Sequence, residues 1–436
     1  MGSKDVKSNR DRFIVTIAAV VGTLIDWYDF FIAATASATV WPIVFFSHLP
    51  TSIAAGLSIA AFGTTYLTRP IGAAVFGNYG DKLGRKSMMV ITMVIMGIAT
   101  FGIAFTPPTT SIGILAVILL FLWRIIFGIG LGGENTGATT WVIEFHHNSK
   151  YRAFWTSLVQ TTAPIGISIA SIVFSLVSAS TGKNFVTFGW RIPFIAGGIA
   201  LIVGILIRVI AFESPIFDQL LKKERLEKTP LLTLLKKYPK LVIKLAFIQN
   251  INLIGLTFLV EPYSLIYLGS LGIAREFSTF ALFLGTVIGG IVPTFILGGI
   301  LADKIGRKLV AFIAAIGLAI FTYPYFLLLS TRNSILIVIA MTLINVFIQM
   351  AFGVYGALGT EQFPTNVRYS GSALSYQLAA FIIGLFITFW EPFLISASHG
   401  IISATPFVSI TASILSIISA LLSLTLIETK GKDLSA

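Results

Sequence analysis

Long apolar stretches constrain this chain more than any other feature. Twelve runs of largely apolar residues follow one another, and a helix of about 20 such residues spans the hydrocarbon core of a bilayer. The runs lie near residues 13–41, 52–77, 87–106, 112–144, 152–179, 190–211, 241–269, 277–302, 308–330, 334–360, 370–396 and 404–427. Charged residues make up only 11% of the chain, whereas soluble domains contain about 25%. We therefore expect an all-α membrane protein with twelve transmembrane helices.

The lack of cysteine removes several kinds of site. Zero Cys excludes disulfide frameworks, cysteine-ligated zinc, iron–sulfur clusters and thiol nucleophiles. The four histidines, which fall in or beside the expected loops, are His48, His146, His147 and His399. The sequence has no P-loop, HExxH or GxSxG element, and its short connections leave little room for a catalytic domain. We expect no cofactor, no metal site and no enzymatic activity.

Lysine and arginine residues gather on one side of the expected helices. With the amino terminus in the cytoplasm, 24 of the 30 fall on the inner side, including nine from Arg208 through Lys244. Four fall outside, and Arg69 and Arg124 lie within helices. This bias follows the positive-inside rule, so the net charge of +12 indicates orientation in a membrane rather than an acidic partner. We expect a multi-pass plasma-membrane protein with both termini cytoplasmic and no nucleic-acid partner.

A ten-residue motif occurs twice in the chain. The pattern GxxxDKxGRK spans residues 77–86 and returns at 299–308, 222 residues later. Such a repeat indicates a duplication of six helices, with one short basic turn in each half. A basic segment at 212–240 separates the halves. We therefore expect an amino-terminal bundle at 1–211, a cytoplasmic linker at 212–240 and a carboxy-terminal bundle at 241–436.

The basic turns have two interpretations. As conformational latches, their glycines allow close backbone approach, Asp81 and Asp303 face helix N-termini, and Arg85 and Arg307 pair with acids. As plain anchors, they only hold the inner ends of helices at the headgroups. Two glycines and an aspartate at fixed offsets are superfluous for anchoring, which favours the latch.

The duplicated turns, twelve helices and central basic linker resemble the major facilitator superfamily over essentially the whole chain. Within it, the sequence is similar to the metabolite:proton symporter family. The residues that carry this similarity are Asp26-Trp27-Tyr28-Asp29-Phe30, Arg69-Pro70-Ile71-Gly72, Arg124 with Gly128, Gly132-Gly133-Glu134, Glu213-Ser214-Pro215 and residues 361–371. The resemblance implies two pseudo-symmetric six-helix bundles that rock about a central cavity, lined by stretches 13–41, 112–144, 241–269 and 334–360.

Four charged residues lie at membrane depth in the first half. Such a charge costs about 2.5–3.5 kcal/mol at a helix centre, so each predicts a function. We expect Asp29, with Asp26, to carry the coupled proton, and Arg124, with Arg69, to bind a substrate carboxylate. The family usually has Glu at the position of Asp26, so the resemblance assigns the proton role to Asp29 more strongly than to Asp26. The alternative is a permanent structural ion cluster.

Further acids and bases are expected to close the inner side. The resemblance favours pairing of Glu144 with Arg85 and of Glu361 with Arg307, whereas Glu134 serves either as a gate contact or as scaffold. The complete gating set that we expect is Asp81, Arg85, Glu134, Glu144, Asp303, Arg307, Glu361 and Arg368.

Polar residues in the second half form rows at helical spacing. Asn250 and Glu261 are eleven residues apart, and Asn345 and Gln349 are four apart, so each pair shares a helix face. We expect these side chains and Tyr263 to line the cavity, although Asn and Gln also hold helices together. Glu391, beside Trp390, is expected to reach water at the outer interface.

These patterns together predict a monomeric, proton-coupled symporter that imports a small organic acid or a zwitterionic metabolite. A sugar:proton symporter is the nearest alternative, because Ile427-Glu428-Thr429-Lys430-Gly431 resembles the closing motif of sugar porters. An exporter is less favoured, because residues 163–166 offer only part of the glycine-rich antiporter signature. A channel or receptor lacks support, since no pore-loop repeat or receiver domain occurs.

Overall fold

The computed structural model describes residues 9–210, 229–260, 262–432 and 434. The first half contains α1 Asn9–Thr39, α2 Trp41–Phe45, α3 Thr51–Leu83, α4 Arg85–Phe105, α5 Thr109–Ile112, α6 Ile114–Phe145, α7 Arg152–Gln160, α8 Thr162–Thr181 and α9 Arg191–Ile210. The second half contains α11 Pro230–Lys237, α12 Pro239–Leu253, α13 Pro262–Ser270, α14 Arg275–Thr286, α15 Val292–Phe295, α16 Leu301–Ile305, α17 Arg307–Ser330, α18 Ser334–Glu361, α19 Arg368–Leu385, α20 Glu391–Ala397 and α21 Ile401–Leu424. Short π-helical segments, such as Ile254–Val260, join several of these helices.

Each of the twelve expected stretches coincides with a helix or a run of helices. Within the described residues, eleven helices are long and apolar enough to cross a membrane. The one expected stretch that is not among those eleven is 52–77, which lies in α3. This helix has 33 residues and extends about 50 Å. Its lower apolarity comes from Arg69 and from the polar residues of the first basic turn. The chain is therefore a multi-pass membrane protein.

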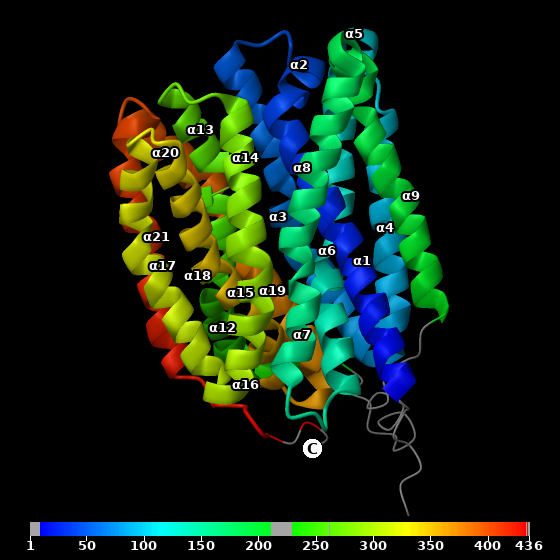
Figure 1. Cartoon of the computed structure of the whole chain (residues 1–436). Helices are drawn as coiled ribbons and strands as arrows, with labels where there is room; N and C mark the ends of the chain where they lie inside the picture. The colour runs from blue at the N-terminus through cyan, green and yellow to red at the C-terminus, as the bar shows by residue number, and fades with distance from the viewer. Residues whose placement is uncertain (1–8, 211–228, 261, 433, 435–436) are drawn as a thin grey trace, which may run out of the picture.

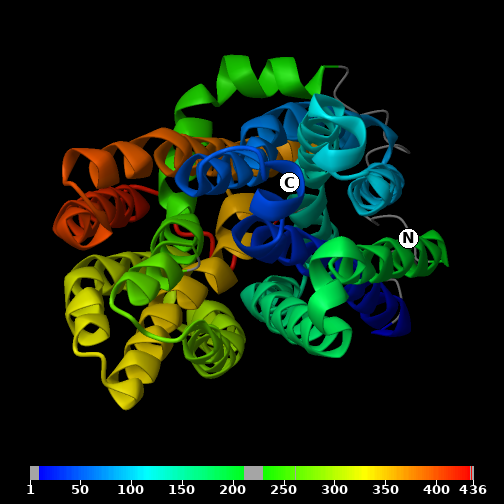
Figure 2. The ribbon, with the colours of Figure 1, turned by 90° about the horizontal axis from the view of Figure 1, so that it is seen from above.

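The helices run side by side as two groups (Figure 1). Helices α1–α9 form one group and α12–α21 the other, and the view from above shows the two groups meeting along a central seam (Figure 2). At this seam α3 packs against α19, α7 against α18, and α8 against α14. The carboxyl terminus lies at the same end as α7 and α16 (Figure 1).

The two copies of the repeated motif have the same backbone shape. Gly84 and Gly306 each separate two helices, with φ of 106° and 107°. That region of φ favours glycine because it has no Cβ. Both turns lie at one end of the molecule, which we call the basic end.

The proposed linker, 212–240, falls partly outside the described residues. Its described part includes α11, which packs against α3 and α19. The amide of Leu231 donates a hydrogen bond to Asn78 of the first basic turn at 3.3 Å. The segment thus contacts both halves at the basic end, while the exact boundaries remain a prediction.

Close crossing of α3 and α6 leads to a stability prediction. A Cβ at Gly132 would collide with the backbone of Arg69, Gly72 and Ala73. Gly132→Ala should therefore cost about 1–3 kcal/mol through overpacking. Gly269→Ala is the matched control, because no atom lies within 4 Å of the added Cβ. Thermal unfolding in detergent should show a lower midpoint for the first variant alone, and equal midpoints would contradict the close crossing.

Candidate transport site and closure of the basic end

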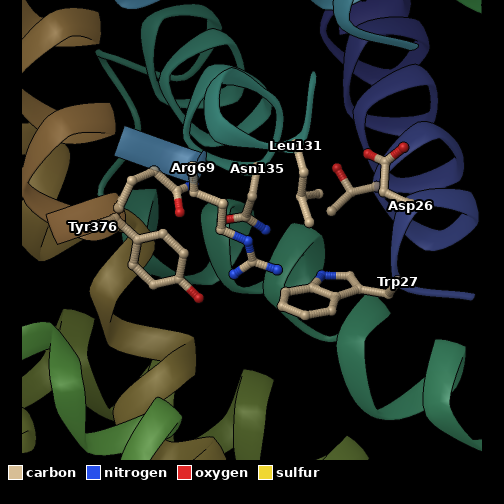
Figure 3. Close-up of a pocket in the computed structure, with 8 residues that line it drawn as sticks. Asp26, Trp27, Arg69, Leu131, Asn135 and Tyr376 are labelled. Atoms are coloured by element: carbon tan, nitrogen blue, oxygen red, sulfur yellow. The ribbon is translucent and has the colours of Figure 1, made fainter. Parts of the chain in front are cut away.

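A small cavity lies between the two halves (Figure 3). Its lining comes from α1, α3 and α6 of the first half and from α19 of the second. The lining residues are Thr23, Asp26, Trp27, Arg69, Leu131, Asn135, Tyr376 and Gln377. The cavity has room for on the order of one water molecule. A carboxyl group and a guanidinium group therefore share one enclosed space, and in this conformation the space is too small for a metabolite.

Arg69 brings a cation to the cavity, and no ion pair joins it to another residue in the part of the chain that the structure describes. Its side chain is 2% exposed, and its guanidinium carbon lies 4.8 Å from the ring centre of Phe30 and 4.5 Å from that of Tyr66. Aromatic faces attract a cation weakly and leave its N–H groups available. Among the described residues, Arg69 Nε and Nη2 have no hydrogen-bond acceptor. The cavity thus presents donors suited to an anion.

Asp26 and Asp29 of α1 face different surroundings. Asp26 lines the cavity, and neither of its oxygens accepts a hydrogen bond from a donor in the described residues. Asp29 accepts a hydrogen bond from Thr100 of α4 and lies against Gly197 of α9. Asp29 also interacts electrostatically with Arg124. Of the two acids, only Asp26 borders the central space.

Arg124 is buried within the first half and does not line the cavity. Its guanidinium carbon lies 5.9 Å from the ring centre of Trp41 and 5.2 Å from those of Phe62 and Phe127. It interacts electrostatically with Asp29, although no direct ion pair joins the two among the described residues. Of the two arginines expected to bind substrate, Arg69 lines the cavity and Arg124 does not.

Some of the polar residues expected to line the cavity from the second half make hydrogen bonds to backbone oxygens, and others have no partner among the described residues. Asn345 donates to Met341 O of its own helix, and Tyr263 donates to Ile401 O. Asn250 and Gln349 are buried, and their side-chain amides have no partner in the described part of the chain. Glu261 lies outside the described residues.

Several lining residues escaped the sequence analysis. Tyr376 and Gln377 of α19 line the cavity, and Asn252 of α12 donates to Tyr376 Oη at 3.4 Å. Asn135 of α6 also lines it and donates to Gln160 of α7 at 3.1 Å. The available signal was the polar run at 370–377 in an otherwise apolar helix.

The expectation that Glu391 reaches water was wrong. Its side chain is 6% exposed, whereas neighbouring Trp390 is 40% exposed. Consecutive helical residues point about 100° apart, so the outward position of Trp390 turns Glu391 into the second half. Glu391 Oε2 has no hydrogen-bond partner among the described residues.

The first basic turn makes a buried ion network that reaches across the seam. Arg85 pairs with Asp81 at 3.2 Å and with Glu144 at 3.3 Å, and Glu144 also pairs with Arg368 of α19 at 3.4 Å. Asp81 accepts a hydrogen bond at 2.9 Å from the amide of Ser370, at the N-terminus of α19. A carboxylate is favoured there by the helix dipole and the free amides.

The second turn repeats this network with the halves exchanged. Arg307 pairs with Asp303 at 2.9 Å and with Glu361 at 3.2 Å, and Glu361 pairs with Arg152 of α7 at 2.9 Å. Asp303 accepts hydrogen bonds from the amides of Ala153 and Phe154, at 3.1 and 2.9 Å, at the start of α7. The two expected glutamate–arginine pairs are both present, and each glutamate also holds an arginine of the opposite half.

The chain after α21 adds to this closure. Glu428 accepts from the amides of Arg307 and Lys308 at 3.0 and 3.2 Å. Arg152, from the other half, donates to Thr429 O at 3.1 Å and to Lys432 O at 2.7 Å. The basic end is therefore shut in this conformation.

Glu134 belongs to a separate ion pair inside the first half. It pairs with Arg208 of α9 and accepts a hydrogen bond from Thr92 of α4 at 2.6 Å. Arg208, one of the basic residues expected on the inner side, is fully buried in this pair. A Cβ at Gly22 of α1 would overlap the Arg208 guanidinium, so this glycine makes room for it.

Comparison with known proteins identifies the family. The model of the Major Facilitator Superfamily matches residues 21–389. The chain belongs to the major facilitator superfamily. The prediction of an all-α, two-bundle facilitator fold is confirmed, and the chain is a membrane transporter for small molecules.

Individual relatives agree with this assignment. The chain is 36% identical to the inner membrane metabolite transport protein YhjE of Escherichia coli, covering 84% of each chain, and 31% identical to the shikimate transporter of that organism, covering 88% of each. Among solved structures, the transporter has the fold of the proton:xylose symporter XylE. The TM-score is 0.80, with 21% identity over 98% of both chains.

Proposed function

We propose that this transporter is a proton-coupled symporter that imports a small organic acid or a zwitterionic metabolite by alternating access. The observation that carries the proposal is the cavity between the halves. There Arg69 and the buried acid Asp26 face one enclosed space, and within the described part of the chain Arg69 has no ion pair and Asp26 meets no hydrogen-bond donor. Arg69 suits a substrate carboxylate, and Asp26 suits the proton.

The proposal extends to the membrane orientation and the gates. The basic end is the cytoplasmic end, and the paired networks of Glu144 and Glu361 close it while the other end opens. Asp29 and Arg124 hold the bundle around Asp26, and Asn250 and Gln349 meet the substrate from the second half. Asp29 and Arg124 lie away from the cavity, so in this proposal they do not exchange partners with the substrate.

A binding screen tests the substrate class. The purified protein is heated with shikimate, which is the substrate that one relative is named for, with a betaine or with xylose, at two pH values. A ligand of the folded state raises the unfolding midpoint. The proposal expects carboxylates or betaines to stabilise the wild type and not Arg69→Ala. Stabilisation by xylose alone would support the sugar symporter instead.

A further inference from the structure

We propose that Asp26 and Glu134 form a carboxyl pair that holds the coupled proton between them, with Arg208 as their shared counterion. This inference rests on the proposed function and deepens it, because it assigns a proton-sharing partner and its positioning residue. The three side chains come from α1, α6 and α9, and each is at most 2% exposed.

The contact between the two acids is the first step. Asp26 shares the cavity with Leu131 and Asn135, and Glu134 lies between these two residues on α6. Arg208, which pairs with Glu134, also lies against Gly22, one turn before Asp26 on α1, and the two carboxyls interact. Two carboxylates have only acceptor oxygens, so they form a hydrogen bond only when one carries a proton. Neither oxygen of Asp26 finds another donor in the described residues. The observed arrangement therefore suits one shared proton.

The local charge balance points the same way. Glu134 pairs with Arg208, and Arg208 also donates to Met89 O at 3.3 Å. Two ionised carboxylates beside one guanidinium leave a net negative charge in the protein interior, which is costly. One bound proton makes the group neutral.

The surrounding groups leave this balance intact. Arg69 of α3 borders the same cavity, yet no ion pair joins it to Asp26 among the described residues, and its guanidinium lies over aromatic rings. Tyr369 of α19, which is neutral, donates to Gly133 O beside Glu134. Asp29, on the same helix as Asp26, interacts electrostatically with Arg124 and accepts a hydrogen bond from Thr100. On the remaining sides, Thr92 of α4 donates to Glu134, and Tyr376 of α19 borders the cavity.

The arrangement also gives Arg208 a positioning role. When the proton leaves, Asp26 becomes a second carboxylate competing for the guanidinium that Glu134 holds. Because Arg208 lies against Gly22, one turn before Asp26 on α1, it is already next to the helix that carries the competing acid. Loss of the proton would thus pull α1, α6 and α9 into a new packing. Such a change of partners links proton release to movement of the bundle.

The test is an infrared measurement that needs no transported substrate. A protonated buried carboxyl gives a C=O stretching band that shifts in D2O, and the proton itself is the probe. The starting protein for these measurements carries Glu391→Gln, which removes another buried acid, one of whose oxygens has no hydrogen-bond partner among the described residues. Near neutral pH this protein should show the band of one protonated carboxyl. Adding either Asp26→Asn or Glu134→Gln should abolish it, because each leaves one carboxylate with one guanidinium. Adding Asp29→Asn should leave the band in place.

Removing the positive charge of Arg208 should change the intensity of the C=O band in the opposite direction. Arg208→Gln should increase the band toward two protonated carboxyls, whereas Arg208→Lys keeps one positive charge and should restore the single band. If Arg208→Gln does not fold, the Asp26, Glu134 and Arg208→Lys variants still test whether the proton is shared. A band that survives Glu134→Gln would overturn the shared-proton proposal even if uptake proves proton-driven. A band with the expected behaviour would uphold the pair even if no imported acid is found, so the two proposals fail separately.

Discussion

Asp26→Asn is expected to abolish uphill, pH-driven uptake while exchange of substrate across the membrane continues. The amide resembles a permanently protonated acid, so the bundle can rock with substrate but cannot release a proton. Asp26 is chosen because it borders the cavity and meets no hydrogen-bond donor in the described residues. Accumulation should fall to the equilibrium level, measured with labelled substrate in vesicles under an imposed pH difference.

The matched comparison is Asp29→Asn, three residues further along the same helix. That change removes the negative charge that interacts with Arg124 and weakens the hydrogen bond from Thr100, so we expect slower transport with accumulation retained. The reverse result, with accumulation lost in Asp29→Asn and kept in Asp26→Asn, would transfer the proton role to Asp29.

Removing both gate glutamates should open the basic end. Glu144 and Glu361 each pair with arginines of both halves. A loss of about 1.4 kcal/mol in these contacts would raise the ratio of molecules with the basic end open to molecules with it closed about tenfold. The combined Glu144→Gln and Glu361→Gln variant should therefore label at least about tenfold faster at a buried reporter. Because the natural chain contains no Cys, Thr139→Cys provides a single reporter, near Gly356 at the seam.

The control for this prediction is Glu391→Gln. It removes a buried glutamate that, among the described residues, takes no part in either ion network, so the labelling rate of Thr139→Cys should stay near that of the parent. Labelling is measured with a membrane-impermeant maleimide applied to the basic end. Equal rates in the gate variant and the parent would show that the networks do not hold this end closed.

Much of the architecture could be predicted from the sequence because the bilayer and the duplication are strong constraints. Apolar runs locate the helices, and the repeated turn places Arg85 near Glu144 and Arg307 near Glu361 by the same geometry. What the turn did not reveal is that each glutamate also holds an arginine of the opposite half.

The direction of individual side chains was harder to predict. Asp26 and Asp29 lie only about 60° apart on α1, yet one faces the cavity and the other the bundle interior. A helix buried on most sides has little amphipathic pattern to fix that choice. The burial of Arg208 was hard to predict for a related reason, because a charge near the end of a helix resembles an interfacial anchor until its neighbour Gly22 is known.

The most direct test of the central claim is solute accumulation in vesicles that carry an imposed pH difference and no membrane potential. With the more acidic solution on the side opposite the basic end, the wild type should concentrate its organic acid or betaine above the outside level, and a protonophore should abolish this. Equal accumulation with and without the pH difference would contradict proton coupling.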